Sequence, residues 1–211
     1  MIFEDRRHAG KLLAETLVTM KIREPVVLAI PRGGVVVAYE VVIRLRCPMD
    51  VIIPRKIGAP FQPELAVGAV TEDGTIYVNK DIVAAIGVSE SYLESEAQSQ
   101  LREIKRRAQV YRKGAQPAEV SGKTAILVDD GVATGATMKA AILSLKKYSP
   151  KKIIIAVPVG AKETIDEFRK QVDEIVCLHV PESMYAIGEF YRNFEQTTDQ
   201  EVVSFLELAK R

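Results

Sequence analysis

The sequence predicts an α/β fold in which five parallel strands form a doubly wound sheet. Five short, almost wholly apolar runs recur along the chain, as is typical of strands that are buried on both faces. Helical segments separate most of these runs, which is the order of strand–helix–strand crossovers. The 211 residues are 47% hydrophobic, enough to bury the core of one such domain. The expected strands are residues 26–30, 51–53, 124–128, 153–157 and 175–178.

The first fifty residues predict one crossover unit. Residues 5–20 carry apolar side chains at helical spacing. The strand at 26–30 is followed by a Pro-Arg-Gly-Gly loop at 31–34 and by a helix over 35–46, and the strand at 51–53 comes next. Two parallel strands joined by a helix explain this order.

The chain then departs from the sheet pattern, and we expect an insertion of a loop or hairpin plus a helix at residues 55–113. Two β-prone runs, 65–70 and 75–78, flank Glu72-Asp73-Gly74. An Asp-Gly turn between such runs predicts a hairpin. A long polar helix at 89–113 follows, with apolar residues at spacings of three and four.

The buried strand pattern returns at residue 124 and continues to 178, with helices between the strands. The tail from residue 181 is aromatic and irregular, and it ends in a helix from about Asp199. We expect residues 181–211 to form a small hood over the carboxyl ends of the strands, where doubly wound sheets bind ligands. Residues 1–211 are therefore predicted to form a single domain.

Composition narrows the classes of function. Charged residues make up 27% of the chain and the net charge is +1, so no nucleic-acid or membrane partner is expected. The N-terminus lacks the apolar run of a signal peptide, and no apolar stretch approaches the ~18 residues of a membrane span. These features predict a cytoplasmic protein. Cys47 and Cys177 fit no metal spacing, which disfavours a zinc site.

Residues 126–138, ILVDDGVATGATM, carry the strongest functional signal. A buried strand delivers Asp129 and Asp130 to its carboxyl end, and the turn at 134–137 then opens a helix. The free N–H groups and the positive dipole end of that helix suit a phosphate. Vicinal hydroxyls are good partners for the carboxylates, so the segment fits a ribose 5-phosphate. Acid pairs at strand ends are also often solvated or cap a helix, but the combination at this spacing favours a functional role.

This segment resembles the 5-phosphoribosyl-1-pyrophosphate (PRPP) motif of type I phosphoribosyltransferases, an acidic pair followed by Thr-Gly-x-Thr after an apolar strand. Almost the whole chain is similar to stand-alone phosphoribosyltransferases of unassigned acceptor. The matching pieces are residues 31–34, 55–74, 128–138 and 186 to about 202.

The resemblance implies that Asp129 and Asp130 are catalytic residues that bind the 3- and 2-hydroxyls of the ribose. The turn that follows them would wrap the 5-phosphate. The residues implied for this phosphate are Ala133, Thr134, Gly135, Ala136 and Thr137.

Two further segments are implied to bind pyrophosphate. Arg32, Gly33 and Gly34 match the pyrophosphate loop, which in the wider fold often holds a non-proline cis peptide. Arg55 and Lys56 resemble a catalytic pair of the orotate branch, where cations neutralise the leaving group. A solvated strand end is the alternative interpretation of these two cations.

The implied reaction moves ribose 5-phosphate from PRPP onto a small nitrogen acceptor, with a nucleobase expected, and releases pyrophosphate. Mg²⁺ is the implied cofactor, held mainly by PRPP and not by direct protein ligands. An oxocarbenium-like transition state requires that water be excluded, and residues 54–65 with the following hairpin are the expected lid. A homodimer is also implied.

The acceptor pocket is expected under the hood, beside Val159. Tyr185, Phe190 and Tyr191 could stack on a planar base, although such aromatic residues are equally typical of a packed hood. Ala133 stands where the hypoxanthine–guanine branch has an aspartate, so a general base would come from elsewhere. The candidates for it are Glu64, Glu72, Asp73 and His179.

Two alternative functions are weighed against the enzyme. A non-catalytic sensor of PRPP or nucleotides would be favoured by a basic surface, but the clearest basic cluster, Lys105-Arg106-Arg107, is typical of a solvated helix face. A dinucleotide-binding domain is disfavoured because no Gly-x-Gly-x-x-Gly follows the first strand. Arg55-Lys56 together with both acids favours catalysis over sensing.

Overall fold

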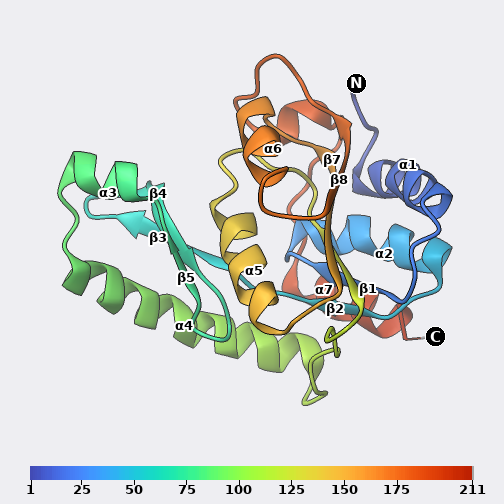
Figure 1. Ribbon diagram of the computed structural model, residues 1–211, viewed down its shortest axis with the longest axis horizontal. Coiled ribbons are helices and arrows are strands. Elements are labelled where there is room, and N and C mark those ends of the chain that lie inside the picture. Colours follow the sequence, from blue (N-terminus) through green and yellow to red (C-terminus); the bar gives the residue numbers. More distant parts are fainter. Residues whose placement is uncertain (211) are drawn as a thin grey trace.

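The computed structural model describes residues 1–210, and its main body is a five-stranded parallel sheet (Figure 1). The strands are β1 (Pro25–Ala29), β2 (Met49–Val51), β6 (Thr124–Val128), β7 (Lys152–Val159) and β8 (Glu174–His179). Their order in the sheet is β2-β1-β6-β7-β8, and every neighbouring pair is parallel. The predicted fold class is confirmed, and the ends of each expected strand lie within about two residues of those observed.

Helices cover both faces of this sheet. One face packs against α1 (Arg6–Thr19), α2 (Gly33–Leu45) and α7 (Asp199–Leu208), and the other against α5 (Ala136–Lys147) and α6 (Lys162–Phe168). Successive residues of a strand point to opposite faces. In β6, Ile126 and Val128 therefore belong to the first core, and Ala125 and Leu127 to the second. The continuous apolar runs in the sequence arise because both faces of the strands are buried.

The strand order creates a switch point between β1 and β6. These strands are neighbours, and Ala29 pairs with Val128 at their carboxyl ends. The chain continues from β1 toward β2 on one side and from β6 toward β7 on the other. Loops that leave in opposite directions open a crevice, which is where doubly wound sheets bind ligands.

An arm is inserted between β2 and β6. It contains an antiparallel sheet of β3 (Arg55–Ala59), β4 (Gln62–Val70) and β5 (Ile76–Val78), followed by α3 (Lys80–Ile86) and α4 (Glu90–Arg112). Figure 1 shows the arm standing to one side of the main sheet, with α4 leading back toward the body.

The arm differs from the expected insertion in two elements. The β4–β5 hairpin and the long helix are as predicted, but β3 and α3 were not expected. The pattern of β3 is hard to recognise because only Ile57 and Ala59 are buried, and the pairing with β4 is irregular on both sides of Gly58. A Cβ at Gly58 would lie 2.6 Å from the carbonyl oxygen of Pro63, so the glycine allows this close approach.

The tail is divided between two locations. Before α7, it runs beside the N-terminal residues, where the amide of Phe3 donates to the carbonyl of Phe190 and the amide of Arg192 donates to the carbonyl of Phe3. The helix α7 instead packs against α2 and α4, with the rings of Tyr39 and Phe205 5.1 Å apart. The expected hood therefore does not include α7, because the apolar side of this helix is buried on a face of the sheet.

None of the helices within residues 1–210 combines the length and the apolar character that crossing a membrane would require.

A buried ion pair ties α4 to the edge of the main sheet. Arg112 Nε donates to both carboxylate oxygens of Asp50 at 3.0 and 3.2 Å, and Arg112 Nη2 donates to the carbonyl of Val51 at 2.8 Å. The amide of Ala118 also donates to Asp50. Both charged side chains are about nine-tenths buried.

We expect Arg112→Ala to lower the free energy of unfolding by about 3 to 5 kcal/mol, because it leaves the carboxylate of Asp50 buried without its partner. Urea denaturation measures this change. Arg102→Ala, an exposed change on the same helix, is expected to alter stability by less than about 0.5 kcal/mol. Equal losses in the two variants would contradict the assignment.

Candidate active site

The loop after β1 and the acid pair after β6 meet at the switch point. The register that pairs Ala29 with Val128 brings residues 31–34 beside Asp129 and Asp130. The peptide bond between Pro31 and Arg32 is cis, which is a feature that the family resemblance suggested. The helix α2 begins at Gly33, so the loop leads directly into it.

The acid pair lies so close to Gly33 and Gly34 that neither position has room for a side chain. A Cβ at Gly33 would lie 1.9 Å from Asp130 Oδ2, and one at Gly34 would lie 2.8 Å from the Cα of Asp129. These distances are below van der Waals contact, so a larger residue at either position would displace the acid side chains or the loop. The sequence suggested that the glycines allow a diphosphate to approach, whereas the structure shows that they also allow the acids to approach.

The two acids have different surroundings. Asp129 accepts the backbone N–H of Asp130 at 2.8 Å. Burial, and then the neighbouring charge of Asp130, raise the pKa of Asp129 well above its ordinary value. Asp130 is 8% exposed and faces a cation instead, because Arg6 Nε donates to Asp130 Oδ2 at 2.7 Å. The pair can therefore hold one proton and accept hydrogen bonds from hydroxyl groups.

Arg6 connects the acid pair to the tail. Its Nη1 donates to the carbonyl of Glu195 at 2.6 Å, and its guanidinium carbon lies 3.8 Å from the centre of the Phe194 ring. Tyr191 adds a second link, because its hydroxyl donates to the backbone carbonyl of Asp130 at 2.6 Å. The tail and the first residue of α1 thus position Asp130 beside the loop after β1.

The turn after the acid pair ends at the N-terminus of α5. Gly135 caps this helix with a φ of 74°, a conformation that favours glycine. A Cβ there would lie 2.7 Å from the ring of Phe168. The cap supplies no side-chain acceptor to the first N–H groups of α5, so these groups and the helix dipole suit an anion. Thr134 is exposed and Thr137 is half-buried.

Arg55 and Lys56 begin β3. They line a separate polar cavity of about 490 Å³, which lies between the β3–β4 hairpin and α4. Arg55 Nε donates to Gln100 Oε1 at 2.5 Å. Arg107 of α4 lines the same cavity. Burial, and then the positive charge of Arg107, lower the pKa of Arg55.

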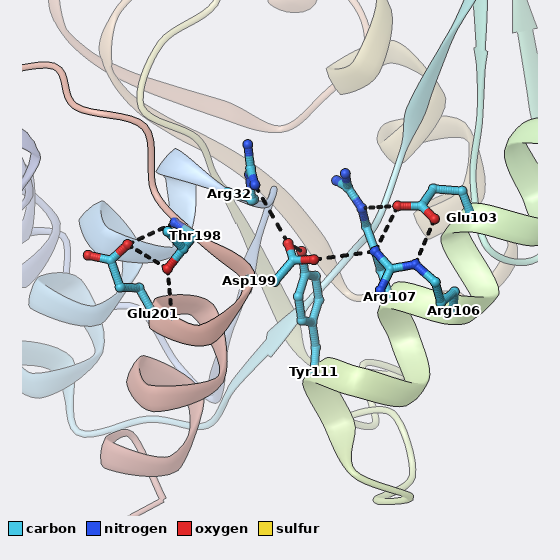
Figure 2. A network of polar contacts seen from close by, with 8 residues as sticks. All are labelled: Arg32, Glu103, Arg106, Arg107, Tyr111, Thr198, Asp199 and Glu201. Carbon is cyan, nitrogen blue, oxygen red and sulfur yellow. Dashed lines mark hydrogen bonds and ion pairs between the residues drawn. The ribbon is translucent and has the colours of Figure 1, made fainter.

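A carboxylate links the arginines of α4 to the loop after β1. Figure 2 shows Asp199, the first residue of α7, between Arg32 on one side and the arginines of α4 on the other. Arg32 Nη1 lies 3.9 Å from Asp199 Oδ1, and Arg106 Nη2 lies 3.3 Å from Asp199 Oδ2. Tyr111 donates to the same carboxylate at 2.7 Å.

The residues predicted for an acceptor are not equally accessible. Val159 is fully buried, and Tyr191 is 6% exposed and packs on Phe3. Phe190 is half-buried and Tyr185 is 89% exposed. The ring surfaces that a planar ligand could reach are therefore those of Tyr185 and Phe190.

Two of the general-base candidates lie far from the acid pair. Glu72 accepts from Arg112 at 2.8 Å, and Asp73 accepts the hydroxyl of Ser144 near the carboxyl end of α5. The acid pair precedes the opposite end of that helix, and the ~1.5 Å rise per residue places about 12 Å, just over two turns, between Ala136 and Ser144. We therefore exclude Glu72 and Asp73 as bases. His179 lies close to the N-terminus, with its Nε2 3.0 Å from the amine of Met1.

A family model described as the phosphoribosyl transferase domain matches residues 3–194. The chain belongs to this family. A Mycobacterium tuberculosis (strain H37Rv) protein provisionally named a phosphoribosyl transferase is 44% identical over 210 residues, which are 100% of this chain and 47% of that protein. The chain spans about half the length of this relative. TT1426 from Thermus thermophilus has a crystal structure that matches with a TM-score of 0.83 and 44% identity over 98% of both chains.

Some of the residues that meet in this phosphoribosyl transferase domain could be predicted from the sequence, and others could not. The two acids, the glycine loop and the turn before α5 were predicted and lie together at the switch point. Arg6 and Asp199 were missed. Arg6 stands in a helix N-terminus 124 positions before its partner Asp130, and no local pattern marks such a contact.

We expect Asp129→Asn to stabilise the fold at pH 7, because the neutral amide keeps the acceptor for the N–H of Asp130 and removes a disfavoured charge. The raised pKa of Asp129 in the folded state means that the wild-type protein loses stability as the pH rises through that pKa. The difference between variant and wild type should vanish below about pH 4, where the unfolded side chain is also protonated. Urea denaturation at several pH values measures it, and a difference independent of pH would contradict the argument.

Proposed function

We propose that this protein is a phosphoribosyltransferase that transfers ribose 5-phosphate from PRPP onto a small nitrogen acceptor, with a nucleobase as the expected acceptor, and releases pyrophosphate. The observation that carries the proposal is the position of Asp129 and Asp130 between two anion-binding elements. The glycine loop packs against the acids on one side, and the N-terminus of α5 follows them on the other. A ligand with two hydroxyls between two phosphate groups fits this order.

Each element has a defined role in this proposal. Asp129 and Asp130 accept hydrogen bonds from the ribose 3- and 2-hydroxyls, and residues 133–137 bind the 5-phosphate. The backbone of the loop at 32–34 approaches the diphosphate, and Arg55 and Lys56 balance its charge. The acceptor nitrogen attacks the anomeric carbon, the bonding electrons leave with pyrophosphate, and the proton released by the acceptor nitrogen passes to the departing pyrophosphate.

The carboxylates at the switch point are compatible with Mg²⁺ that is bound together with PRPP. Mg²⁺ is usually held by one or two carboxylates together with substrate phosphates and water. In this proposal Mg²⁺ is held mainly by the phosphates and hydroxyls of PRPP, and Asp129 and Asp130 bind the same ribose hydroxyls beside the proposed diphosphate loop. When bound, the ion would neutralise charge on the diphosphate as it departs.

The acceptor side is supported by Tyr185 and Phe190, whose rings are accessible at the hood. Either ring could stack on a planar base. Residues 54–65 and the hairpin after them are the proposed lid, because β4 contacts α5 at Ala69, Ala136 and Ala140 and so borders the proposed 5-phosphate turn. Closure there would exclude water from an oxocarbenium-like transition state.

We expect the protein to release pyrophosphate from PRPP and Mg²⁺ only when an acceptor is present, as measured with purine and pyrimidine bases offered singly. Asp130→Asn should reduce this rate by roughly tenfold to hundredfold, because each hydrogen bond to a charged group contributes about 1.5 to 3 kcal/mol. Asp166→Asn, an exposed carboxylate on α6, is the matched control and should leave the rate unchanged.

Titration calorimetry with PRPP separates the enzyme from a sensor. Tight PRPP binding that Asp130→Asn weakens, without turnover on any base, would favour a non-catalytic PRPP sensor. A protein that binds neither PRPP nor ribose 5-phosphate would overturn the proposed function altogether.

A further inference from the structure

The helix α4 brings a cation, Arg107, to the polar cavity that lies between α4 and the β3–β4 hairpin. Arg107 lines this cavity together with Arg55 and Lys56, while Glu96 is its acidic neighbour. Three positive groups and one carboxylate around a space of about 490 Å³ leave an excess of positive charge. Such a cavity favours an anionic ligand.

Arg107 differs from the arginine beside it. The side chain of Arg106 is 52% exposed, whereas that of Arg107 is 20% exposed. Both donate to Glu103, but Arg106 does so through two nitrogens and Arg107 through Nε alone, at 2.8 Å. Figure 2 shows the terminal nitrogens of Arg107 pointing away from Glu103. These are the groups that bind phosphate oxygens in pairs.

Arg107 and Arg55 line the same cavity and repel each other. The positive charge of Arg107 acts on Arg55, which is already partly desolvated, and lowers the pKa of that residue. Glu103 offsets part of this repulsion but is shared with Arg106. A bound polyanion would relieve the rest.

The arginines of α4 also lie close to the glycine loop, with one carboxylate between them. Asp199 lies between Arg32 of that loop and Arg106 of α4, at 3.9 and 3.3 Å. Figure 2 shows Arg32 and Arg107 directed to the same side of this network. Cations of β3 and α4 thus line one cavity, and Arg32 of the loop faces the α4 arginines across Asp199.

We propose that Arg107 is a diphosphate-binding residue, supplied by α4 and held toward the cavity by Glu103, which acts with Arg32 and Arg55. This inference rests on the proposed function and extends it to a residue outside the sequence motifs. The leaving pyrophosphate gains negative charge as the glycosidic bond breaks. A planar guanidinium fixed on a rigid helix can meet that charge with two hydrogen bonds and little reorganisation.

The test is titration calorimetry with inorganic pyrophosphate plus Mg²⁺ and, separately, with ribose 5-phosphate. Arg107→Gln should weaken pyrophosphate binding by roughly tenfold to hundredfold, because a charge-assisted bond is lost. It should leave the affinity for ribose 5-phosphate within about twofold, since that phosphate binds at α5. Arg102→Gln, an exposed arginine on the same helix, has the same charge change and should leave both affinities unchanged.

Glu103→Gln is expected to have the opposite effect on pyrophosphate binding to that of Arg107→Gln. It removes a carboxylate that competes for Arg107 while keeping an oxygen acceptor, so pyrophosphate should bind more tightly. A purely structural role of the Glu103 network predicts instead that both variants bind pyrophosphate more weakly, and that result would overturn the inference. Arg107→Lys, which keeps the charge and loses the paired donors, should fall between Arg107→Gln and wild type.

The controls distinguish this inference from the proposed function. Wild-type protein that binds neither ligand would refute the proposed function. Wild-type binding of both, with pyrophosphate affinity unchanged in Arg107→Gln, would refute only the role of Arg107. Equal losses in Arg107→Gln and Arg102→Gln would show a long-range effect of net charge and would refute it as well.

Discussion

The close packing of the glycine loop on the acid pair is the constraint on which the rest of the site depends. The parallel register of β1 and β6 brings the two segments together, and the missing Cβ atoms of Gly33 and Gly34 let them touch. Because α2 begins at Gly33, any displacement of the loop would also displace a helix of the main core. The geometry of the crevice is therefore fixed by core packing and not by flexible loops alone.

Charge is arranged unfavourably both in this crevice and in the polar cavity beside α4. Burial and a neighbouring acid raise the pKa of Asp129, while burial and a neighbouring arginine lower the pKa of Arg55. In each case the charged form is disfavoured by its surroundings. Natural proteins accept such costs chiefly where a ligand relieves them. Hydroxyl donors facing the acids and phosphates facing the cations would relieve both.

The sequence predicted the sheet and the central residues of the site because their signals are local. Apolar runs mark strands that are buried on both faces, and the acids, the glycines and the turn before α5 each stand directly after or between such strands. The phosphoribosyl transferase family and the parallel sheet are confirmed, whereas the roles of individual residues stay predictions.

The remaining features depend on contacts that are distant along the chain. Arg6 reaches Asp130, and Asp199 lies between Arg32 and α4, although neither contact has a sequence pattern. The basic cluster at 105–107 was interpreted as a solvated face. Helical periodicity alone cannot tell that Arg106 is exposed while its neighbour Arg107 is turned into a cavity, because that depends on where the β3–β4 hairpin lies.

The helix α4 carries both the arginine that ties the arm to the main sheet and an arginine that lines the polar cavity. Arg112 fixes the end of α4 to Asp50 at the edge of the sheet, and Arg107 lies five residues earlier, about 7.5 Å along the axis. A buried ion pair this close limits how far Arg107 can move relative to β2, from which the chain continues into Arg55. The cations of α4 and β3 are thus held by the same edge of the sheet. An insertion that would otherwise be mobile can therefore present charge at a defined distance from the acid pair.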